Sequence, residues 1–494
     1  MSPAPRLSPE TLADLPADVA RPAYDRAAAR VGVVHLGVGA FHRAHQATVF
    51  DHALKAGDLR WGILGASLRS PTVRNALAPQ DDLYTLVVRD GGGEQRRIIG
   101  ALKRCLVAPE NPAALIEAMA SPEVHLATLT VTEKGYHLGP EGSLSLNDPA
   151  IIADLANPGA PSTAIGLIAR ALELRRARGL SAFSAVSCDN MANNGATLGA
   201  AVLAFARASD PALADWIAAH AAFPSTMVDR IVPATTPEDI DALTAAIGVR
   251  DEAMVKTEPF LQWVIEDRFA GERPDFEALG VQVVASVEPW GQAKLRLLNG
   301  AHSAMAYLGG LAGLSFVHEF VADAGRRAFI ERLWNETAQT LTPAPGLDIP
   351  AYRAALMARF ANPALHHSLR QIAMDGSQKL PQRLIAPLAA RLERDRPSPA
   401  LSLAVAGWIK WQSGRTDAGE TFVVEDPLAA DLQGRLAGLN QPDERVGALL
   451  SLSSVFPASS AASLALRRAL VDCLRGLDSF GAAAMVGKAA GFRS

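Results

Sequence analysis

One stretch near the start of the chain limits its fold more than any other. Residues 31–46 read Val-Gly-Val-Val-His-Leu-Gly-Val-Gly-Ala-Phe-His-Arg-Ala-His-Gln, a β-branched run that passes through a Gly-x-Gly turn into a helical pattern. A glycine-rich turn between a strand and a helix lets a pyrophosphate approach the backbone and the helix N-terminus. The stretch predicts the start of a Rossmann-type domain. The residues expected at a dinucleotide are Gly37, Val38, Gly39, Ala40 and Phe41.

The third glycine of the usual Gly-x-Gly-x-x-Gly pattern is absent, because His42 stands in its place. A tight strand-to-helix turn without a ligand is therefore the alternative interpretation. The next predicted strand, 61–68, is followed by Arg69 and not by the acid that often binds the ribose hydroxyls. Arg69 can face a 2′-phosphate or be an ordinary surface charge, so we expect NAD and leave NADP open.

Alternating strands and helices continue through the first half of the chain. Besides 61–68, strands are expected around 84–88, 97–99, 124–131 and 183–187, with a helix at about 162–178. This alternation predicts a mostly parallel sheet. Residues 1–30 are rich in Ala and Pro and are expected to lie over the domain as a surface arm.

Polar residues follow two of these strands, where ligands bind in open α/β sheets. They are Thr132, Glu133 and Lys134 after strand 124–131, and Asn190 after strand 183–187. We expect Thr132 and Glu133 at the cofactor. Asn and Asp also favour turns through local hydrogen bonds, and this interpretation fits Asn193 and Asn194 better than Asn190.

A second feature lies further along the chain, at residues 293–313. Its apolar residues recur as in a buried helix, yet it carries Lys294, Asn299 and His302. At ~100° per residue these three fall at about 0°, 140° and 80°, within one arc of an α-helix. Burying an amine, an amide and an imidazole is costly unless they satisfy one another or a ligand. When this stretch is considered alone, the simpler interpretation is that the three polar residues mark the solvent-exposed edge of a helix.

The chain has 494 residues, of which 49% are hydrophobic, and this is enough for two domains. We expect a dinucleotide-binding domain at 1–285 and a mainly helical domain at 286–494, because apolar positions recur at helical spacing from about residue 316 onward. A net charge of −4 gives no general attraction for nucleic acid or an anionic membrane. Three scattered cysteines, a polar N-terminus without a signal peptide and the lack of a long apolar run predict a cytoplasmic protein.

Six motifs, taken in order along the chain, carry a resemblance to a known family. They are Gly37–Gln46, Thr132–Tyr136, Ser187–Asn190, Met227–Ile231, Glu258–Asp267 and Lys294–His302. Together they resemble the polyol-specific long-chain dehydrogenases, the mannitol dehydrogenase family. The resemblance implies a metal-independent, nicotinamide-dependent oxidoreductase of carbohydrate metabolism, with an N-terminal Rossmann domain and a largely helical C-terminal domain.

The resemblance also assigns roles to single residues. The implied catalytic residues are Lys294 as general base, Asn190 and Asn299 as hydrogen-bond donors to the reacting oxygen, and His302 beside them; the implied substrate contacts include Asp229 and Lys379. These residue types suit the oxidation of a secondary alcohol, because a desolvated, neutral lysine can take the hydroxyl proton while hydride leaves the carbon. Two amide donors can stabilise the developing alkoxide.

Two departures from the family pattern bear on the substrate. Mannitol dehydrogenases have an arginine where Gln371 stands, and the run 371–383 is instead similar to that of fructuronate reductases (D-mannonate oxidoreductases). Lys134 is a cation that polyol-oxidising members lack, although a solvated loop charge is an equally good interpretation. Because a carboxylate calls for a cationic anchor, we expect a sugar acid such as D-mannonate. The candidate anchors are Lys134, Arg370 and Lys379.

Other interpretations stay open. A mannitol 2-dehydrogenase or another polyol dehydrogenase is the alternative within the family, and a non-catalytic nucleotide-binding regulator is the alternative outside it. A regulator would be expected to lose Lys294 or Asn299, and both are present. Residues 290–292 lack a glutamate that related sequences often carry, so the route by which a proton leaves Lys294 is open, with Glu288 as the nearest acid.

We expect no metal ion, because no set of His, Cys and Asp has convincing ligand spacing. The nearest candidates are the pairs His42/His45 and His366/His367. The expected partner is a small sugar acid or polyol, and the chain is expected to be a monomer or a weak homo-oligomer.

Overall fold

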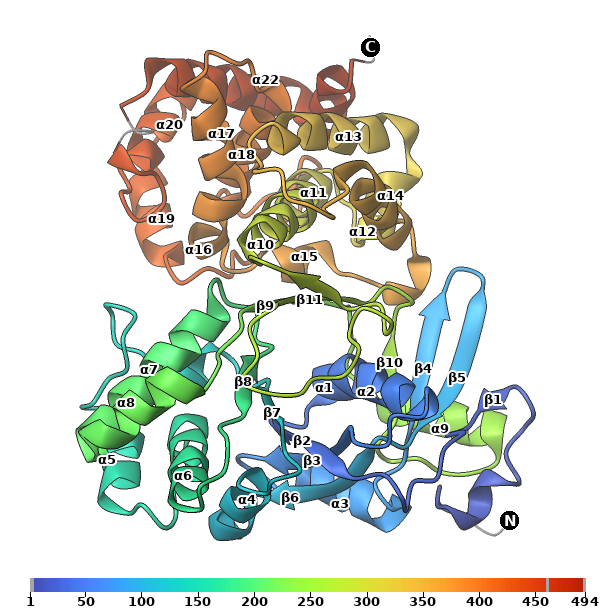
Figure 1. The fold of residues 1–494 in the computed structure, drawn as a ribbon. Coiled ribbons are helices and arrows are strands. Elements are labelled where there is room, and N and C mark those ends of the chain that lie inside the picture. Colours follow the sequence, from blue (N-terminus) through green and yellow to red (C-terminus); the bar gives the residue numbers. More distant parts are fainter. Residues whose placement is uncertain (1–3, 459–461, 492–494) are drawn as a thin grey trace. The chain divides into compact units, whose positions relative to one another are not determined.

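The computed structural model describes residues 4–458 and 462–491 (Figure 1). The chain forms two compact units, Met1–Glu288 and Pro289–Ser494, called unit 1 and unit 2 below. All named strands of the described residues lie in unit 1, whereas unit 2 is built from helices. Within the described residues, no helix combines the length and the apolar character needed to cross a membrane.

A five-stranded parallel sheet forms the centre of unit 1. Its order is β6-β3-β2-β7-β8, and each neighbouring pair is parallel. The strands are β2 (Val31–Leu36), β3 (Gly62–Ser67), β6 (Leu102–Val107), β7 (Leu126–Leu129) and β8 (Ser184–Ser187). Strand order runs outward in both directions from β2, as in a Rossmann-type fold. The predicted α/β fold with a mostly parallel sheet is confirmed.

Both faces of this sheet are buried. Along β2, Val34 and Leu36 pack into one apolar cluster, whereas Val33 packs into another. Successive side chains of a strand point to opposite faces, so an uninterrupted apolar run is what a strand covered on both sides needs. The helices that line the first cluster are α4 (Pro112–Met119), α6 (Ala164–Ala177) and α7 (Asn194–Ser209), and α2 (Gln46–Lys55) lines the second.

Two of the predicted strands lie outside the parallel sheet. β4 (Tyr84–Asp90) and β5 (Gly93–Ile99) form an antiparallel hairpin. The hairpin belongs to a second sheet, of order β1-β5-β4-β10, in which β10 is Val255–Thr257. The expectation that they join the parallel sheet is wrong, because a two-residue connection can join only antiparallel strands.

The strand that the sequence analysis missed, β6, takes the edge position of the parallel sheet. Lys103 and Arg104 interrupt its apolar pattern, and both side chains are at least partly exposed. Charged residues are common on edge strands, since an edge strand pairs on one side only. A local apolar pattern therefore does not reveal β6.

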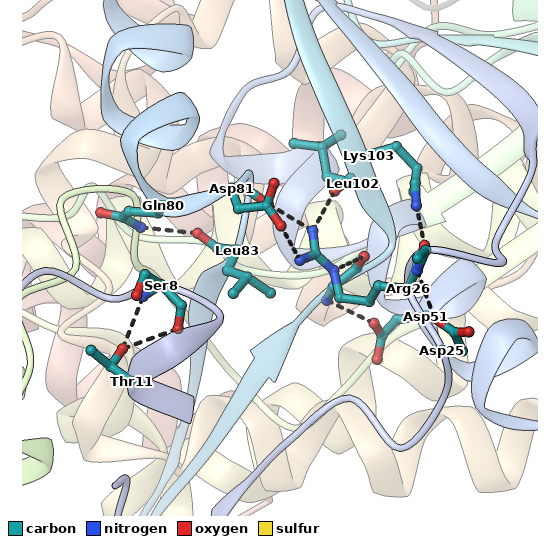
Figure 2. A network of polar contacts seen from close by, with 12 residues as sticks. Ser8, Thr11, Asp25, Arg26, Asp51, Gln80, Asp81, Leu83, Leu102 and Lys103 are labelled. Atoms are coloured by element: carbon teal, nitrogen blue, oxygen red, sulfur yellow. Dashed lines mark hydrogen bonds and ion pairs between the residues drawn. The ribbon is translucent and has the colours of Figure 1, made fainter. Parts of the chain in front are cut away.

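The N-terminal segment is part of unit 1 and not merely a surface arm, which corrects the expectation for residues 1–30. β1 (Val19–Ala20) pairs with β5. Arg26 donates hydrogen bonds of 2.6 Å to both the carboxylate and the carbonyl of Asp81, and one of 3.1 Å to the Gly100 carbonyl (Figure 2). The apolar residues of the segment that are buried include Leu7, Leu15 and Val19.

A short third sheet lies in the same unit. It consists of β9 (Thr226–Asp229), β11 (Gln262–Glu266) and β12 (Gln282–Val284). β9 runs antiparallel to β11, and β11 runs parallel to β12. In this register Asp229, the last residue of β9, stands opposite Gln262.

Unit 2 is organised around α11 (Gly300–Leu311), every residue of which is buried. A helix that is apolar all round must be covered on every side. α15 (Leu369–Ala373), α18 (Pro399–Trp411) and α22 (Leu464–Ala489) pack against it (Figure 1). The other helices used below are α10 (Glu288–Ala293), α13 (Ala324–Ala338), α14 (Ile349–Phe360), α16 (Gly376–Leu380) and α17 (Ala386–Leu392). The predicted helical character of this part of the chain is confirmed.

The helix predicted at 293–313 is not one continuous α-helix. α10 ends at Ala293, residues Lys294–Asn299 form a π-helix called η4, and α11 begins at Gly300. The Gly300 N–H donates to the Leu295 carbonyl, five residues back. The rotation of ~100° per residue of an α-helix therefore does not apply between Lys294 and Asn299, and the predicted angular positions are corrected. π-Helices are rare and occur frequently at functional sites.

Candidate active site

The turn after β2 requires glycine at position 37. Gly37 has φ +96°, and a Cβ at this position would lie 2.2 Å from the carbonyl oxygen of Thr130. The Gly39 N–H donates to the Gly37 carbonyl at 2.7 Å, which closes a tight turn. Helix α1 (Ala40–Ala44) begins directly after this turn. The backbone is thus left bare where a phosphate group can approach it.

The buried His35 and the half-buried Thr130 hold the Gly37 carbonyl. The Thr130 hydroxyl donates to it at 2.8 Å, and Nε2 of His35 lies 3.2 Å from it and 3.0 Å from the Thr130 hydroxyl. The other ring nitrogen of His35 lies 2.7 Å from the Thr128 hydroxyl. Burial lowers the pKa of His35 to about 3, so its ring is neutral near pH 7. No local pattern predicts this role, because Thr128 and Thr130 lie on and directly after another strand, β7.

A pocket of about 450 Å³ opens at the carboxyl ends of β2, β3 and β7, a size typical of small-ligand and cofactor sites. Five residues predicted at the cofactor line it: Gly37, Val38, Gly39, Arg69 and Thr132. Three further residues predicted there, Ala40, Phe41 and Glu133, are not part of this lining.

Part of the pocket lining was not predicted. It includes Ser67, Thr130, Ser162 and Thr163. Thr163 is the N-cap of α6, where its hydroxyl accepts a hydrogen bond from the Gly166 N–H. A Ser-Thr pair before a predicted helix is a recognisable N-cap signal, so this edge of the pocket could have been found from the sequence.

Asp189 joins the ends of β7 and β8. Its carboxylate accepts hydrogen bonds from the Thr132 N–H at 2.7 Å and from the Tyr136 hydroxyl at 2.8 Å. Thr132 has φ +66°, a left-handed conformation that costs a non-glycine residue about 1–3 kcal/mol. Burial raises the pKa of Asp189 above its usual range. Asp189 therefore shapes the 132–136 loop, a role that sequence reasoning missed because its partners come from a different strand end.

The asparagines after β8 divide into structural and exposed positions. Asn194 is fully buried; its amide donates to the Asp189 carbonyl at 2.9 Å, and its oxygen accepts from the Thr226 N–H at 2.8 Å. Asn193 has φ +51° and precedes α7 as its N-cap residue. Asn194 therefore has a structural role that joins this loop to the start of β9, whereas the Asn193 side chain makes no capping hydrogen bond. Asn190, like Asn193, is exposed.

Asp229 at the end of β9 and Arg230 directly after it are both buried. Arg230 donates to the Glu258 carbonyl at 3.0 and 3.2 Å, and it also donates to the Ala44 carbonyl. The Ile231 N–H donates to the Glu258 carboxylate at 2.7 Å. Arg230 thus fixes the backbone around Asp229, which is only 7% exposed.

In unit 2, Lys294 and Asn299 stand at the two ends of η4, and His302 stands in the first turn of α11. Lys294 and Asn299 are both half-buried. The Trp334 indole N–H donates to the Leu297 carbonyl at 2.9 Å. A hydrogen bond from α13 therefore supports the π-helix between the lysine and the asparagine.

His302 has an apolar and cationic environment. Its ring centroid lies 4.9 Å from that of Phe360 and 4.7 Å from that of His367. Burial lowers the pKa of His302 well below its usual range, and the charges of His367, Arg359 and Arg383 lower it further. Among the residues that the structure describes, its Nε2 has no hydrogen-bond partner. The ring is therefore neutral, with one polar atom left for a ligand.

The three cations predicted as carboxylate anchors differ in their surroundings. The Lys379 ammonium donates to the Met374 carbonyl at 2.6 Å and lies 3.8 Å from the Asp375 carboxylate. Burial lowers the pKa of Lys379, and the charge of Arg383 lowers it further. Arg370 is exposed, and its guanidinium lies over the Phe422 ring at 4.9 Å from the centroid. Lys134 is exposed on a short 3₁₀ helix.

No group of three or more His, Cys, Asp or Glu side chains in the described parts of the chain could hold a metal ion. His42 stacks on His35 at 3.4 Å between ring centroids, and burial lowers the pKa of His42 well below its usual range. Nε2 of His45 lies 2.9 Å from the Gln262 carbonyl. The His42/His45 pair is therefore part of the packing beneath the glycine turn.

A Rossmann-type unit with a cofactor-sized pocket and a helical unit with a Lys–Asn–His group define the class, a nicotinamide-type dehydrogenase. Residues 31–278 match the mannitol dehydrogenase Rossmann domain, and residues 286–468 match the mannitol dehydrogenase C-terminal domain. The chain therefore belongs to the mannitol dehydrogenase family, as its motifs predicted. It is an oxidoreductase that acts on CH–OH groups.

Named relatives fall on both sides of the substrate question. D-mannonate oxidoreductase of Escherichia coli (strain K12) is 44% identical over 453 residues, which cover 90% of this chain and 93% of the relative. A mannitol 2-dehydrogenase of Pyrenophora tritici-repentis is 39% identical over 480 residues, covering 95% of this chain and 84% of the relative. The structure of Pseudomonas fluorescens mannitol 2-dehydrogenase in a ternary complex with NAD and D-mannitol matches with a TM-score of 0.81 at 36% identity, covering 98% of this chain and 99% of that one.

Proposed function

We propose that the protein is an NAD-dependent, metal-independent oxidoreductase that interconverts a secondary alcohol and a ketone on a sugar acid, namely D-mannonate and D-fructuronate. The 44% identity to D-mannonate oxidoreductase supports this substrate. The 39% identity to a mannitol 2-dehydrogenase is close enough that identity alone does not choose between them. The observation that carries the proposal is the positive charge around His302.

Cationic side chains gather near this histidine. Burial is the main cause of the lowered pKa of His302, and the charges of Arg359 and Arg383 lower this pKa further. The charge of Arg383 also lowers the pKa of Lys379. Arg383 is half-buried, and burial lowers the pKa of its guanidinium, because a desolvated cation is less stable than one in water. A bound carboxylate would offset this cost through charge-assisted hydrogen bonds, whereas an uncharged polyol would not. The substrate expected at this position is therefore an anion.

NAD fits the pocket of unit 1. The bare backbone at Gly37 and Gly39 leaves room for the pyrophosphate, and the pocket volume of about 450 Å³ suits part of a dinucleotide. The residues that would hold it are Gly37, Val38, Gly39, Arg69 and Thr132. When bound, the nicotinamide accepts hydride from the substrate carbon or returns it. None of the lining residues is acidic, so NADP remains the alternative cofactor and Arg69 the residue that would select it.

The protein's own residues handle the proton and the oxygen. Lys294 takes the hydroxyl proton during oxidation and returns it during reduction. Asn190 and Asn299 donate hydrogen bonds to the reacting oxygen and stabilise its developing charge. Asp229 and neutral His302 bind neighbouring hydroxyl groups, the latter through Nε2, which has no hydrogen-bond partner in the described parts of the chain.

The second candidate function is a mannitol 2-dehydrogenase or another polyol dehydrogenase, such as one acting on arabinitol. It is favoured by the match of nearly the whole chain to a mannitol 2-dehydrogenase structure. A non-catalytic nucleotide-binding regulator is a remote third candidate, opposed by the presence of both Lys294 and Asn299. We further propose that the protein works in the cytoplasm as a monomer or a weak homo-oligomer.

A paired assay tests the substrate. Purified protein is given D-fructuronate and D-fructose in turn, and the oxidation of NADH, then of NADPH, is followed by absorbance. We expect kcat/KM for fructuronate to exceed that for fructose by at least about 100-fold, because one charged group at a binding site changes affinity by roughly 2–5 kcal/mol. A preference for fructose would instead support the polyol dehydrogenase as the function. Absence of turnover with either sugar and a panel of polyols would favour the regulator.

A further inference from the structure

The two π-helices of unit 2 pack against each other. η4, which carries Lys294 and Asn299, contacts a second π-helix, η6 (Pro381–Ile385). They meet at Gly300, where a Cβ would lie 3.0 Å from the carbonyl oxygen of Arg383. The glycine directly after Asn299 thus lets the backbone of Arg383 approach the helix that carries the proposed catalytic groups. Arg383 was not among the residues predicted at the site.

The side chain of Arg383 reaches the same helix. Its Nη1 donates to the Ser303 hydroxyl at 3.3 Å, and Ser303 directly follows His302. Its positive charge contributes to the lowered pKa of His302. The Nε2 atom of His302 has no hydrogen-bond partner among the described residues. A cationic donor and an unsatisfied ring nitrogen therefore lie near one turn of α11.

The guanidinium of Arg383 has few partners for its degree of burial. The long bond to Ser303 is its one hydrogen bond within residues 4–458 and 462–491, and it has no ion pair there, although the side chain is half-buried. A guanidinium has five N–H donors, and desolvated donors without partners are costly. Burial lowers the pKa of Arg383, which reflects this cost.

Another buried arginine shows how such a side chain is satisfied when its role is structural. Arg175 in α6 donates hydrogen bonds to several backbone carbonyls. Its acceptors are the carbonyls of Met119, Ser121, Val124 and Ser181. Arg391 in α17 is held similarly, by Ser398, Gln339, Pro397 and Glu336. Arg383 is only half-buried and differs from both, since most of its donors have no partner among the residues that the structure describes.

We propose that Arg383 binds the carboxylate of the sugar-acid substrate and so selects sugar acids over uncharged polyols. This inference rests on the proposed function and names its specificity residue. A guanidinium can hold a carboxylate through two parallel hydrogen bonds, a geometry that lysine cannot reproduce. The previously considered anchors are less suited: the Lys379 ammonium is already bonded to the Met374 carbonyl and lies near Asp375, and Arg370 is exposed over Phe422.

The test compares Arg383→Leu and Arg383→Lys with the wild-type protein on fructuronate and on fructose. For Arg383→Leu we expect kcat/KM for fructuronate to fall about 100-fold or more, mainly through KM, while that for fructose stays within about 3-fold. Arg383→Lys keeps the charge but loses the paired geometry, so it should lose about 10-fold on fructuronate alone.

Arg394→Leu is the matched control, since it removes an exposed positive charge shortly after η6 and should leave both substrates unchanged. If Arg383→Leu does not fold, Arg383→Gln gives the same comparison with a polar side chain. Equal losses on both sugars would show a structural role and overturn the inference, as would an unchanged fructuronate rate. Wild-type preference for fructose, in contrast, would overturn the proposed function itself, whatever the variants do.

Discussion

The glycine turn offers a prediction in which two neighbouring residues behave oppositely. Gly37→Ala places a methyl group at φ +96° and 2.2 Å from the Thr130 carbonyl oxygen. The left-handed conformation costs an alanine about 1–2 kcal/mol, and pushing β2 and β7 apart costs about 1–3 kcal/mol, as overpacking usually does. We therefore expect Gly37→Ala to lower the free energy of unfolding by about 2–5 kcal/mol.

Gly39→Ala is the matched partner of this variant. Gly39 has φ −88°, which any residue adopts, and its Cβ would meet only the Gly37 carbonyl oxygen, at 3.9 Å. Its free energy of unfolding should change by less than about 1 kcal/mol. The new methyl group would, however, stand where the pyrophosphate approaches the backbone, so NADH should bind at least about 10-fold more weakly.

Urea denaturation followed by circular dichroism gives the first quantity, and NADH fluorescence titration gives the second. We expect a stability defect for Gly37→Ala and a binding defect without a stability defect for Gly39→Ala. Equal urea midpoints for the two variants would refute the steric argument at Gly37. Unchanged NADH affinity in Gly39→Ala would show that the cofactor does not pass over this turn.

Three further perturbations test other parts of the site. Lys294→Ala should lower turnover about 10³-fold or more while NADH affinity stays the same; turnover within a few-fold of wild type would refute the role of general base. A strong chelator should leave activity unchanged, since no metal-binding group is found in the described residues, and a steep loss would indicate a metal. Burial lowers the pKa of His35 from 6.5 to about 3, so the unfolded protein binds a proton at this residue more readily than the folded protein does. The stability should therefore be full above pH 6.5 and fall as the pH drops toward 3. The free energy of unfolding should decrease by up to about 4 kcal/mol. Urea titrations at several pH values should show a shallower fall for His35→Asn, and an identical fall would refute this assignment.

The features that the sequence predicted correctly are those that depend on a local pattern of residues. The β-branched run at 31–36 and its glycine turn were identified because strand, turn and helix follow one another without interruption. The helical character of unit 2 was identified from apolar spacing alone. The edge strand β6 and the hairpin β4–β5 were not assigned correctly, because their neighbours in the sheets are decided by pairing with distant residues.

The polar residues that shape the site illustrate the same limit. Asp189 acts through Thr132 and Tyr136, and His35 acts through Thr128 and Thr130. In each case the partners lie on β7 or in the segment that follows it. The distance between partners in the chain leaves no pattern within either segment. The Arg383 contact to Ser303 spans 80 residues and is of the same kind. Residues that touch a ligand can match a motif, whereas residues that position them need the fold.

The π-helix η4 brings Lys294 and Asn299 closer in direction than the α-helix that the sequence predicted. Five residues separate Lys294 from Asn299, and in an α-helix this is about 1.4 turns, which sets the two side chains ~140° apart. A turn closed by a hydrogen bond from Gly300 back to Leu295 holds one residue more, so five residues make close to one full turn. The amine and the amide are thereby brought toward the same face, and His302, three residues beyond Asn299 in regular α-helix, follows on that side. The wider turn forgoes regular helical hydrogen bonding, and the bond from Trp334 to the Leu297 carbonyl supports it in return. The departure from regular helix at 294–299 thus fits the proposed placement of Lys294 as base and Asn299 as oxygen-binding amide on one side of one helix.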